Sequence, residues 1–184
     1  MGIIFYGLMF LAMDLILPLK SDVWEMKIGL MPDILGFILL AIGLKKLKTN
    51  SVYFSRAISV CIGMVLPSAL YFGMGLMGQK GLVMALLALL CVIGTIVVGF
   101  LVIAGLRDME CNDDVDVHAT TLRTFWLSYT AIRALAFLVS IVLLFGYFSL
   151  LGAIASYATD IIGLTFMVLF YRTKNKFEEI YVFE

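Results

Sequence analysis

The run LVMALLALLCVIGTIVVGFLVIAGL, residues 82–106, contains no charged side chain. A helix needs about 20 predominantly apolar residues to cross the ~30 Å hydrocarbon core of a bilayer, and this run exceeds that length. The run therefore predicts a transmembrane helix.

The composition of the whole chain points the same way. Of its 184 residues, 63% are hydrophobic and 14% are charged. Soluble domains are about half apolar and a quarter charged, so a water-soluble fold would have too few polar residues to cover its surface. Thirteen basic residues balance thirteen acidic ones, which leaves no basic excess for binding nucleic acid. We expect an integral membrane protein with one transmembrane domain over residues 1–184.

Five further apolar runs flank the first one, and turn residues or charges separate them. We expect an all-α polytopic fold with about six transmembrane helices arranged as three helical hairpins. The predicted helices cover residues 2–18, 28–44, 52–77, 82–106, 125–147 and 150–171. The second run is short and begins at Pro32-Asp33. Residues 19–36 are therefore alternatively a re-entrant or interfacial element.

The basic residues predict the orientation of these helices. Nine of the thirteen would lie on one side of the membrane, namely Lys45, Lys46, Lys48, Arg56, Arg107, Arg123, Arg172, Lys174 and Lys176. Lys20, Lys27 and Lys80 would lie on the other side, and Arg133 within a helix. By the positive-inside rule the first side is cytoplasmic. We expect a multi-pass plasma-membrane protein with both termini, the acidic loop 107–123 and the tail 172–184 in the cytoplasm.

Four ionisable residues fall inside predicted helices, namely Asp14, Asp33, Arg133 and Asp160. A charge at the centre of a membrane helix costs about 2.5–3.5 kcal/mol on insertion scales, so each should face the interior and have a partner. Arg133 and Asp160 lie at comparable depths in neighbouring helices, which predicts an ion pair. This pair either locks the two helices together or belongs to a proton, ion or substrate site.

Asp33 follows Pro32 and suits the first position of a helix, where it would act as a cap. If Asp14 and Asp33 reach one cavity, the two carboxylates could bind a cation or share a proton. Asp33 and Asp160 each stand twelve residues before a cation at a helix end, and Thr95 takes the equivalent place in the fourth helix. This spacing indicates a threefold repeat or a coincidence of similar helices.

Hydroxyl-bearing side chains accompany the buried charges. Tyr129 lies one helical turn from Arg133, and Ser156 and Tyr157 lie close to Asp160 in sequence. In the third helix Ser68 follows Pro67, whose missing N–H predicts a kink and a freed backbone carbonyl. A packing salt bridge alone does not require so many polar neighbours.

The sequence lacks the motifs of the common enzyme and metal sites. It contains no Gly-rich phosphate loop, nucleophile elbow or His-Glu-x-x-His motif, and His118 is its only histidine. We expect no enzymatic activity, no cofactor and no metal site. The acidic residues of the loop are interpreted as a solvated linker that caps the fifth helix.

The segment PDILGF, residues 32–37, together with GLKKL at residues 43–47, resembles a pattern in small uncharacterised membrane proteins of Gram-positive bacteria. That resemblance implies no activity. The size and the six expected crossings are also similar to the substrate-binding subunits of energy-coupling-factor vitamin transporters. Residues 6–17 lack the Ala-x-x-x-Ala docking motif of those subunits.

Two hypotheses about function follow from these patterns. The first is a small membrane transport protein or transport subunit that binds a small polar ligand or cation among Asp14, Asp33, Arg133 and Asp160. The alternative is a non-enzymatic regulatory or assembly partner. In that case the buried ion pair is structural, and the loop 107–123 or the tail contacts another protein.

Overall fold

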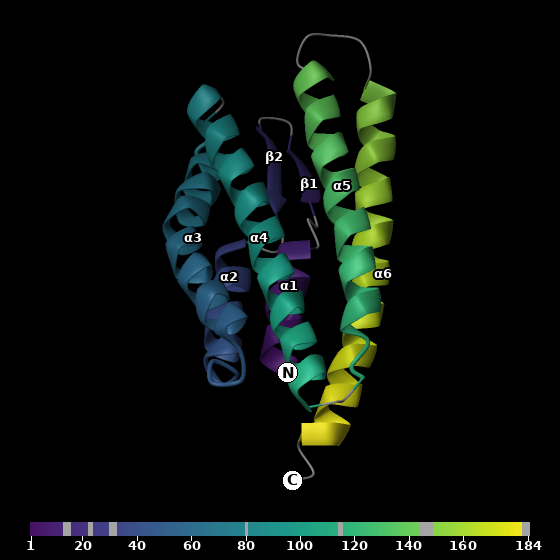
Figure 1. The fold of residues 1–184 in the computed structure, drawn as a ribbon. Helices are drawn as coiled ribbons and strands as arrows, with labels where there is room; N and C mark the ends of the chain where they lie inside the picture. Colours follow the sequence, from purple (N-terminus) through teal and green to yellow (C-terminus); the bar gives the residue numbers. More distant parts are fainter. Residues whose placement is uncertain are drawn as a thin grey trace.

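Six helices and one two-stranded sheet make up the described part of this computed structural model (Figure 1). The structure describes residues 1–12, 16–21, 24–29, 33–79, 81–113, 116–143 and 149–181; of residues 16–21, 24–29, 136–143, 149–160 and 181 it describes only the backbone. The elements are α1 (Gly2–Ala12), β1 (Ile16–Ser21), β2 (Trp24–Gly29), α2 (Asp33–Lys45), α3 (Val52–Leu76), α4 (Leu82–Asp113), α5 (Ala119–Leu143) and α6 (Ser149–Tyr181). The predicted number of helices is confirmed within these residues.

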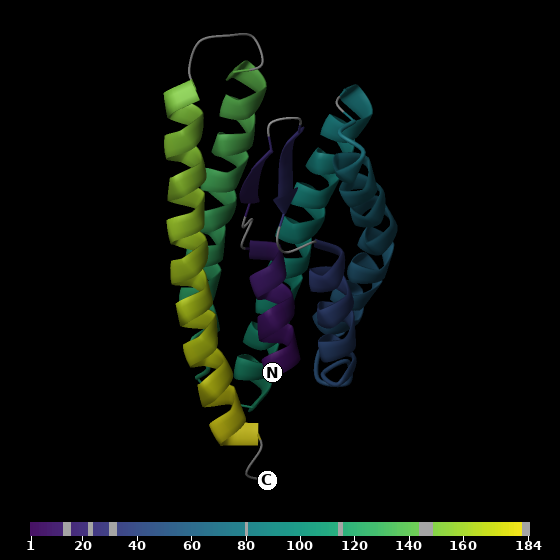
Figure 2. The ribbon, with the colours of Figure 1, turned by 180° about the vertical axis from the view of Figure 1, so that it is seen from behind.

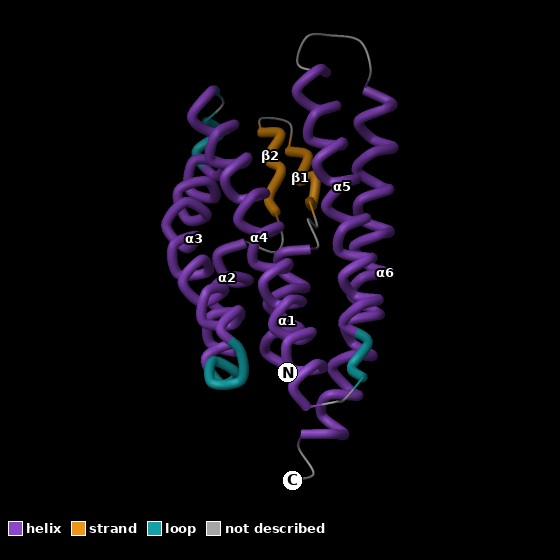
Figure 3. The backbone as a smooth tube through the Cα atoms, viewed as in Figure 1, coloured by secondary structure: helices purple, strands orange, loops and turns teal. Residues whose placement is uncertain are grey.

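The helices pack in the order of the chain and close into a ring. Each helix contacts its successor, and α6 returns to α1. Seen from behind, α1 lies between α2 and the α5–α6 pair (Figure 2). Both termini lie at one end of the molecule (Figure 1). The α2–α3 and α4–α5 connections lie toward the same end (Figure 3). The basic residues in and next to these two connections therefore lie toward this end.

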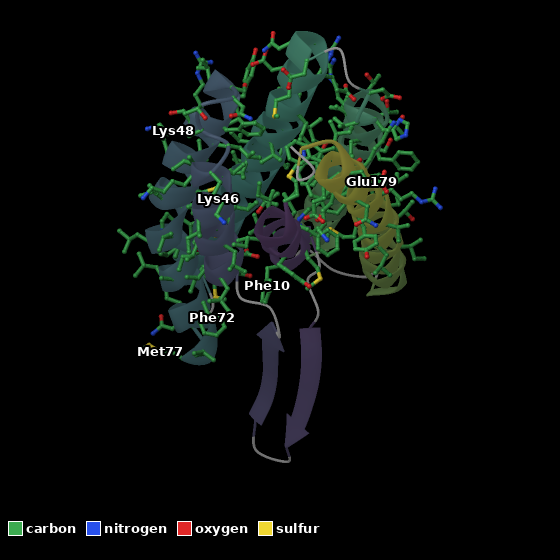
Figure 4. All side chains as sticks on the ribbon, turned by 90° about the horizontal axis from the view of Figure 1, so that it is seen from below. Phe10, Lys46, Lys48, Phe72, Met77 and Glu179 are labelled. Atoms are coloured by element: carbon green, nitrogen blue, oxygen red, sulfur yellow. The ribbon has the colours of Figure 1, made fainter. Side chains whose placement is uncertain are left out.

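The first two helices are shorter than the sequence predicts, and a β-hairpin separates them. The prediction of a helix over residues 2–18 is wrong from Ile16 onward, because residues 16–21 form β1. The prediction over 28–44 is wrong at its start, because β2 runs to Gly29 and α2 begins at Asp33. The strands pair antiparallel, from Ile16 with Gly29 to Ser21 with Trp24, and they extend away from the helices (Figure 4).

The sequence carried a signal for the second strand. The residues WEMKI, 24–28, alternate strictly between apolar and charged types, which is the period of a strand and not of a helix. Pro18 in β1 cannot donate a ladder hydrogen bond, and it disfavours helical backbone in the residue before it. A two-stranded ribbon tolerates proline because both of its strands are edges.

The last three helices extend beyond the bounds that the sequence predicts. Much of the predicted loop 107–123 is helical, since α4 continues to Asp113 and α5 begins at Ala119. Residues 172–181 of the predicted tail are also helical, since α6 continues to Tyr181. Thr173 and Phe177 are buried at helical spacing, and Lys174 pairs with Glu178 one turn away at 3.4 Å. This amphipathic pattern extends the helix beyond its apolar section.

Two described helices, α3 and α4, are long and apolar enough to cross a membrane. Both expose a row of large apolar side chains, including Ile62, Leu66 and Leu70 on α3 and Leu86 and Leu90 on α4. Such a face is expected of a helix that borders lipid. With 11 and 13 residues, α1 and α2 reach only about 16 and 20 Å at 1.5 Å per residue. Six crossings therefore remain a prediction.

Glycines allow α1 and α2 to approach until their backbones touch. A Cβ on Gly7 would lie 3.1 Å from the carbonyl oxygen of Gly36, and a Cβ on Gly36 would lie 3.1 Å from that of Gly7. On the same interface Leu11 and Leu40 are fully buried. Small residues at a helix crossing let backbones pack closely in this way.

We predict that Gly36→Ala destabilises the protein, because the added methyl group meets Leu11 and the Gly7 carbonyl. Overpacking of this kind costs about 1–3 kcal/mol. The thermal unfolding midpoint in detergent measures the effect. Gly63→Ala is the matched control, since nothing lies within 4 Å of a Cβ at that helical position. Equal midpoints for the two variants would contradict the close α1–α2 contact.

Candidate functional site

The end of α1 is held by two side chains of α5. The Nη1 group of Arg133 donates a hydrogen bond to the carbonyl oxygen of Leu11 at 3.1 Å. The hydroxyl of Tyr129 donates to the carbonyl oxygen of Ala12 at 3.2 Å. The last carbonyls of a helix have no partner within the helix and carry partial negative charge. The end of α1 lies in the interior of the protein. The guanidinium and the phenol therefore supply hydrogen-bond donors to its last carbonyls.

Arg133 is held in place by an aromatic cluster. It is 9% exposed, it donates to the hydroxyl of Tyr129, and its guanidinium carbon lies 5.7 Å from the centre of the Tyr129 ring. Trp126 packs against Tyr129 at 5.1 Å and against Phe166 of α6 at 4.8 Å between ring centres. The three α5 residues share one helix face because they are spaced by three and four.

The pairing of α5 with α6 sets the level of Asp160. Trp126 packs on Phe166, and the Tyr129 ring lies against Gly163. The two helices are therefore antiparallel, and residues further along α5 face residues earlier in α6. This register brings the backbone of residue 160 level with Arg133. The side chains of Asp160, Ser156 and Tyr157 lie outside the described part of the structure. The Arg133–Asp160 ion pair therefore stays a prediction.

Asp33 lies at the same level as the end of α1. It is the first residue of α2 and is half-buried. Leu11 packs against Gly36, so Asp33 begins α2 about 4.5 Å beyond that contact, one rise of three residues. Asp14 lies outside the described residues. The structure thus gathers the end of α1, the start of α2 and Arg133 in one region.

Thr95 of α4 is a further buried polar residue, which the sequence marks only by its spacing from Arg107. It is 1% exposed, and its hydroxyl makes no hydrogen bond within the described part of the chain. Gly94 packs on Met64 and Gly99 on Trp126. Thr95 therefore lies close to the level of Tyr129. Burying an unpaired hydroxyl costs about 1–3 kcal/mol, so its presence requires an explanation.

Ser68 does not contribute a free hydroxyl to this region. It donates to the carbonyl oxygens of Met64 at 2.7 Å and Val65 at 3.1 Å, both in its own helix. Pro67 lies inside α3 and has no N–H to donate. The serine thus satisfies backbone acceptors next to the proline. Its role in the structure is local to α3.

Carboxylates hold residues 116–119, the described part of the acidic connection and the start of α5. Glu110 accepts hydrogen bonds from the backbone N–H groups of Val117 and Ala119, both at 2.8 Å, and so caps α5. The backbone N–H of His118 donates to Asp116 and holds the pKa of that carboxyl below its ordinary value, with the charges of His118 and Lys176 adding to the effect. Lys176 lies 3.5 Å from Asp116, which ties this connection to α6.

Three cavities in the described part of the chain lie away from Arg133. One of about 360 Å³ lies between α3, α4 and α5 near the end that holds the termini. A second of about 200 Å³ follows the α4–α5 groove. A third of about 320 Å³ lies between α5 and α6 near Lys176. None of the three is lined by Asp33, Thr95, Tyr129 or Arg133.

No protein-family model matches the chain, and no curated protein or solved structure matches it significantly.

We predict that Tyr129→Phe destabilises the protein by about 1–3 kcal/mol, because the Ala12 carbonyl loses its donor in a buried position. Thermal unfolding in detergent measures the loss. The control is Tyr6→Phe, since the Tyr6 side chain is 55% exposed. If Tyr129→Phe unfolds at the wild-type temperature, the phenol does not hold the end of α1.

Proposed function

We propose that the chain is a small membrane transport protein or transport subunit. Its polar or ionic ligand binds where α1 ends and α2 begins. The observation that carries the proposal is the guanidinium of Arg133, which is buried half-way along α5 and donates to the Leu11 carbonyl at the end of a half-length helix. Discontinuous helices whose ends meet buried charges are a common way for transporters to hold ligands.

The polar groups around this point suit a ligand of small size. Arg133 offers a fixed positive charge with several N–H donors. The Thr95 hydroxyl adds a donor and an acceptor that the described helices leave unused. Asp33 and the predicted participants Asp14 and Asp160 would supply carboxylates for a coupled cation or proton. A site of this composition would bind a polar ligand through both charge and hydrogen bonds.

The alternative function also has an observation in its favour. Arg133 and Tyr129 bond to main-chain carbonyls, and a pair of this kind could serve only to fix α1 against α5. The protein would then be a non-enzymatic regulatory or assembly partner. The ordered α4–α5 connection and the end of α6 would present the contact surface for another protein.

Thr95→Val separates the two functions. Valine keeps the shape and removes the unpaired hydroxyl, so we predict a thermal midpoint equal to or above that of the wild type. If Thr95 serves a ligand, the same variant should lose at least tenfold in ligand affinity. Purified protein would be screened by thermal shift against small inorganic anions, alkali cations and amino acids, and each hit would be followed by uptake into proteoliposomes.

Matched variants complete this experiment. Thr165→Val removes an exposed hydroxyl from α6 and should leave both affinity and stability unchanged. Arg133→Lys should weaken ligand binding and cost about 1–3 kcal/mol of stability, because lysine lacks the guanidinium fork. A ligand response that is the same in Thr95→Val, Arg133→Lys and wild type would place the ligand elsewhere. A stability loss in Arg133→Lys with no transport of any ligand would favour the partner function.

A further inference from the structure

Two of the three cavities lie next to each other on the outside of the ring. The larger is lined by Tyr53, Arg107, Asp108 and Arg123, and the apolar one by Trp126 and other residues of α4 and α5. Phe100 lines both. A cationic cavity of about 360 Å³ therefore adjoins an apolar groove at Phe100.

The cationic part lies at the end of the molecule that carries both termini. Arg107 is seven residues beyond Phe100 in α4, a rise of about 10 Å toward that end. Arg123 lies one turn before Trp126 in α5 and toward the same end (Figure 1). Both arginines are exposed and form no hydrogen bond or ion pair within the described residues. With Asp108 in the same cavity, the two guanidinium groups leave a net positive charge.

The apolar part follows the surface of the longest apolar run. Val97 and Leu127 line it and are about half exposed, and Trp126 forms its floor, since its indole N–H donates to the carbonyl oxygen of Ile96 at 3.3 Å. Gly99 allows this position, because a Cβ there would lie 2.0 Å from the Trp126 ring. The groove is thus fixed by the packing of α4 on α5.

We propose that these two adjoining cavities form a binding site for one anionic glycerophospholipid. The phosphate lies between Arg107 and Arg123, and an acyl chain lies along the α4–α5 groove. Charge complementarity selects the headgroup, because basic pockets between membrane helices on the cytoplasmic side bind anionic lipid heads. The adjoining apolar groove favours a lipid over a free phosphate, which would leave the groove empty. The site requires α4 to border a bilayer and does not depend on transport.

Native mass spectrometry in detergent tests the headgroup part of the site. We expect one dioleoyl phosphatidylglycerol to bind at least tenfold more tightly than dioleoyl phosphatidylcholine. The double variant Arg107→Ala/Arg123→Ala should lose about tenfold or more in affinity for phosphatidylglycerol. Lys48→Ala/Arg56→Ala removes the same charge from exposed residues outside the cavity and should lose less than about threefold.

Fluorescence quenching tests the acyl-chain part. The chain has two tryptophans, so Trp24→Phe leaves Trp126 as the single reporter. Phosphatidylglycerol with brominated acyl chains should quench Trp126 at concentrations where brominated phosphatidylcholine does not. Val97→Phe narrows the groove and should weaken quenching several-fold, whereas Ile93→Phe, one turn away on the same exposed face, should not.

Three results would overturn the proposal. The first is equal binding of the two lipids. The second is an equal loss in the two double variants, which would mean diffuse attraction by the basic end. The third is displacement of the lipid by millimolar inorganic phosphate with no quenching of Trp126, which would mean a site for a free anion. None of these results bears on Arg133 or Thr95, so the transport proposal stands or falls separately.

Discussion

The structure depends on how the end of α1 is satisfied. A helix of 11 residues stops inside the molecule, and its last carbonyls must find donors or lose several kilocalories per mole in an apolar surrounding. Arg133 and Tyr129 supply these donors from α5. The rest of the ring follows from this contact: α5 and α6 hold α1 on one side, and the Gly7–Gly36 contact joins α1 to α2 on the other.

The long helices could be predicted from the sequence because their apolar runs are long enough to leave one interpretation. The start of α3 at Val52 agrees with its prediction, and so does the start of α4 at Leu82. The face shared by Trp126, Tyr129 and Arg133 follows from their spacing alone. Helix starts and shared helix faces depend on residues close together in the sequence, so hydropathy and spacing are enough to predict them.

The hairpin and the helix extensions could not be predicted in the same way. Residues 2–18 read as one apolar run, and only the short alternation at residues 24–28 indicates a strand. Hydropathy predicts an acidic loop at 107–123. Glu110 caps α5, however, and the connection between the helices is shorter than this loop. In the site itself, the acceptors are the carbonyls of Leu11 and Ala12, and an apolar side chain gives no sign that its backbone has such a role.

The buried and the exposed arginines differ in what a ligand must do to reach them. Arg133 already donates to a carbonyl and to a phenol, so an anion there gains a charged hydrogen bond only by using its remaining N–H groups or by releasing the end of α1. In the proposed transport function, binding at Arg133 would thereby be coupled to the position of a whole helix, as a conformational step in transport requires. Arg107 and Arg123 are exposed at the end of the molecule, and an anion there gains their charge without moving a helix. A static ligand such as a lipid is therefore suited to the outer pair, and a transported one to the inner residue.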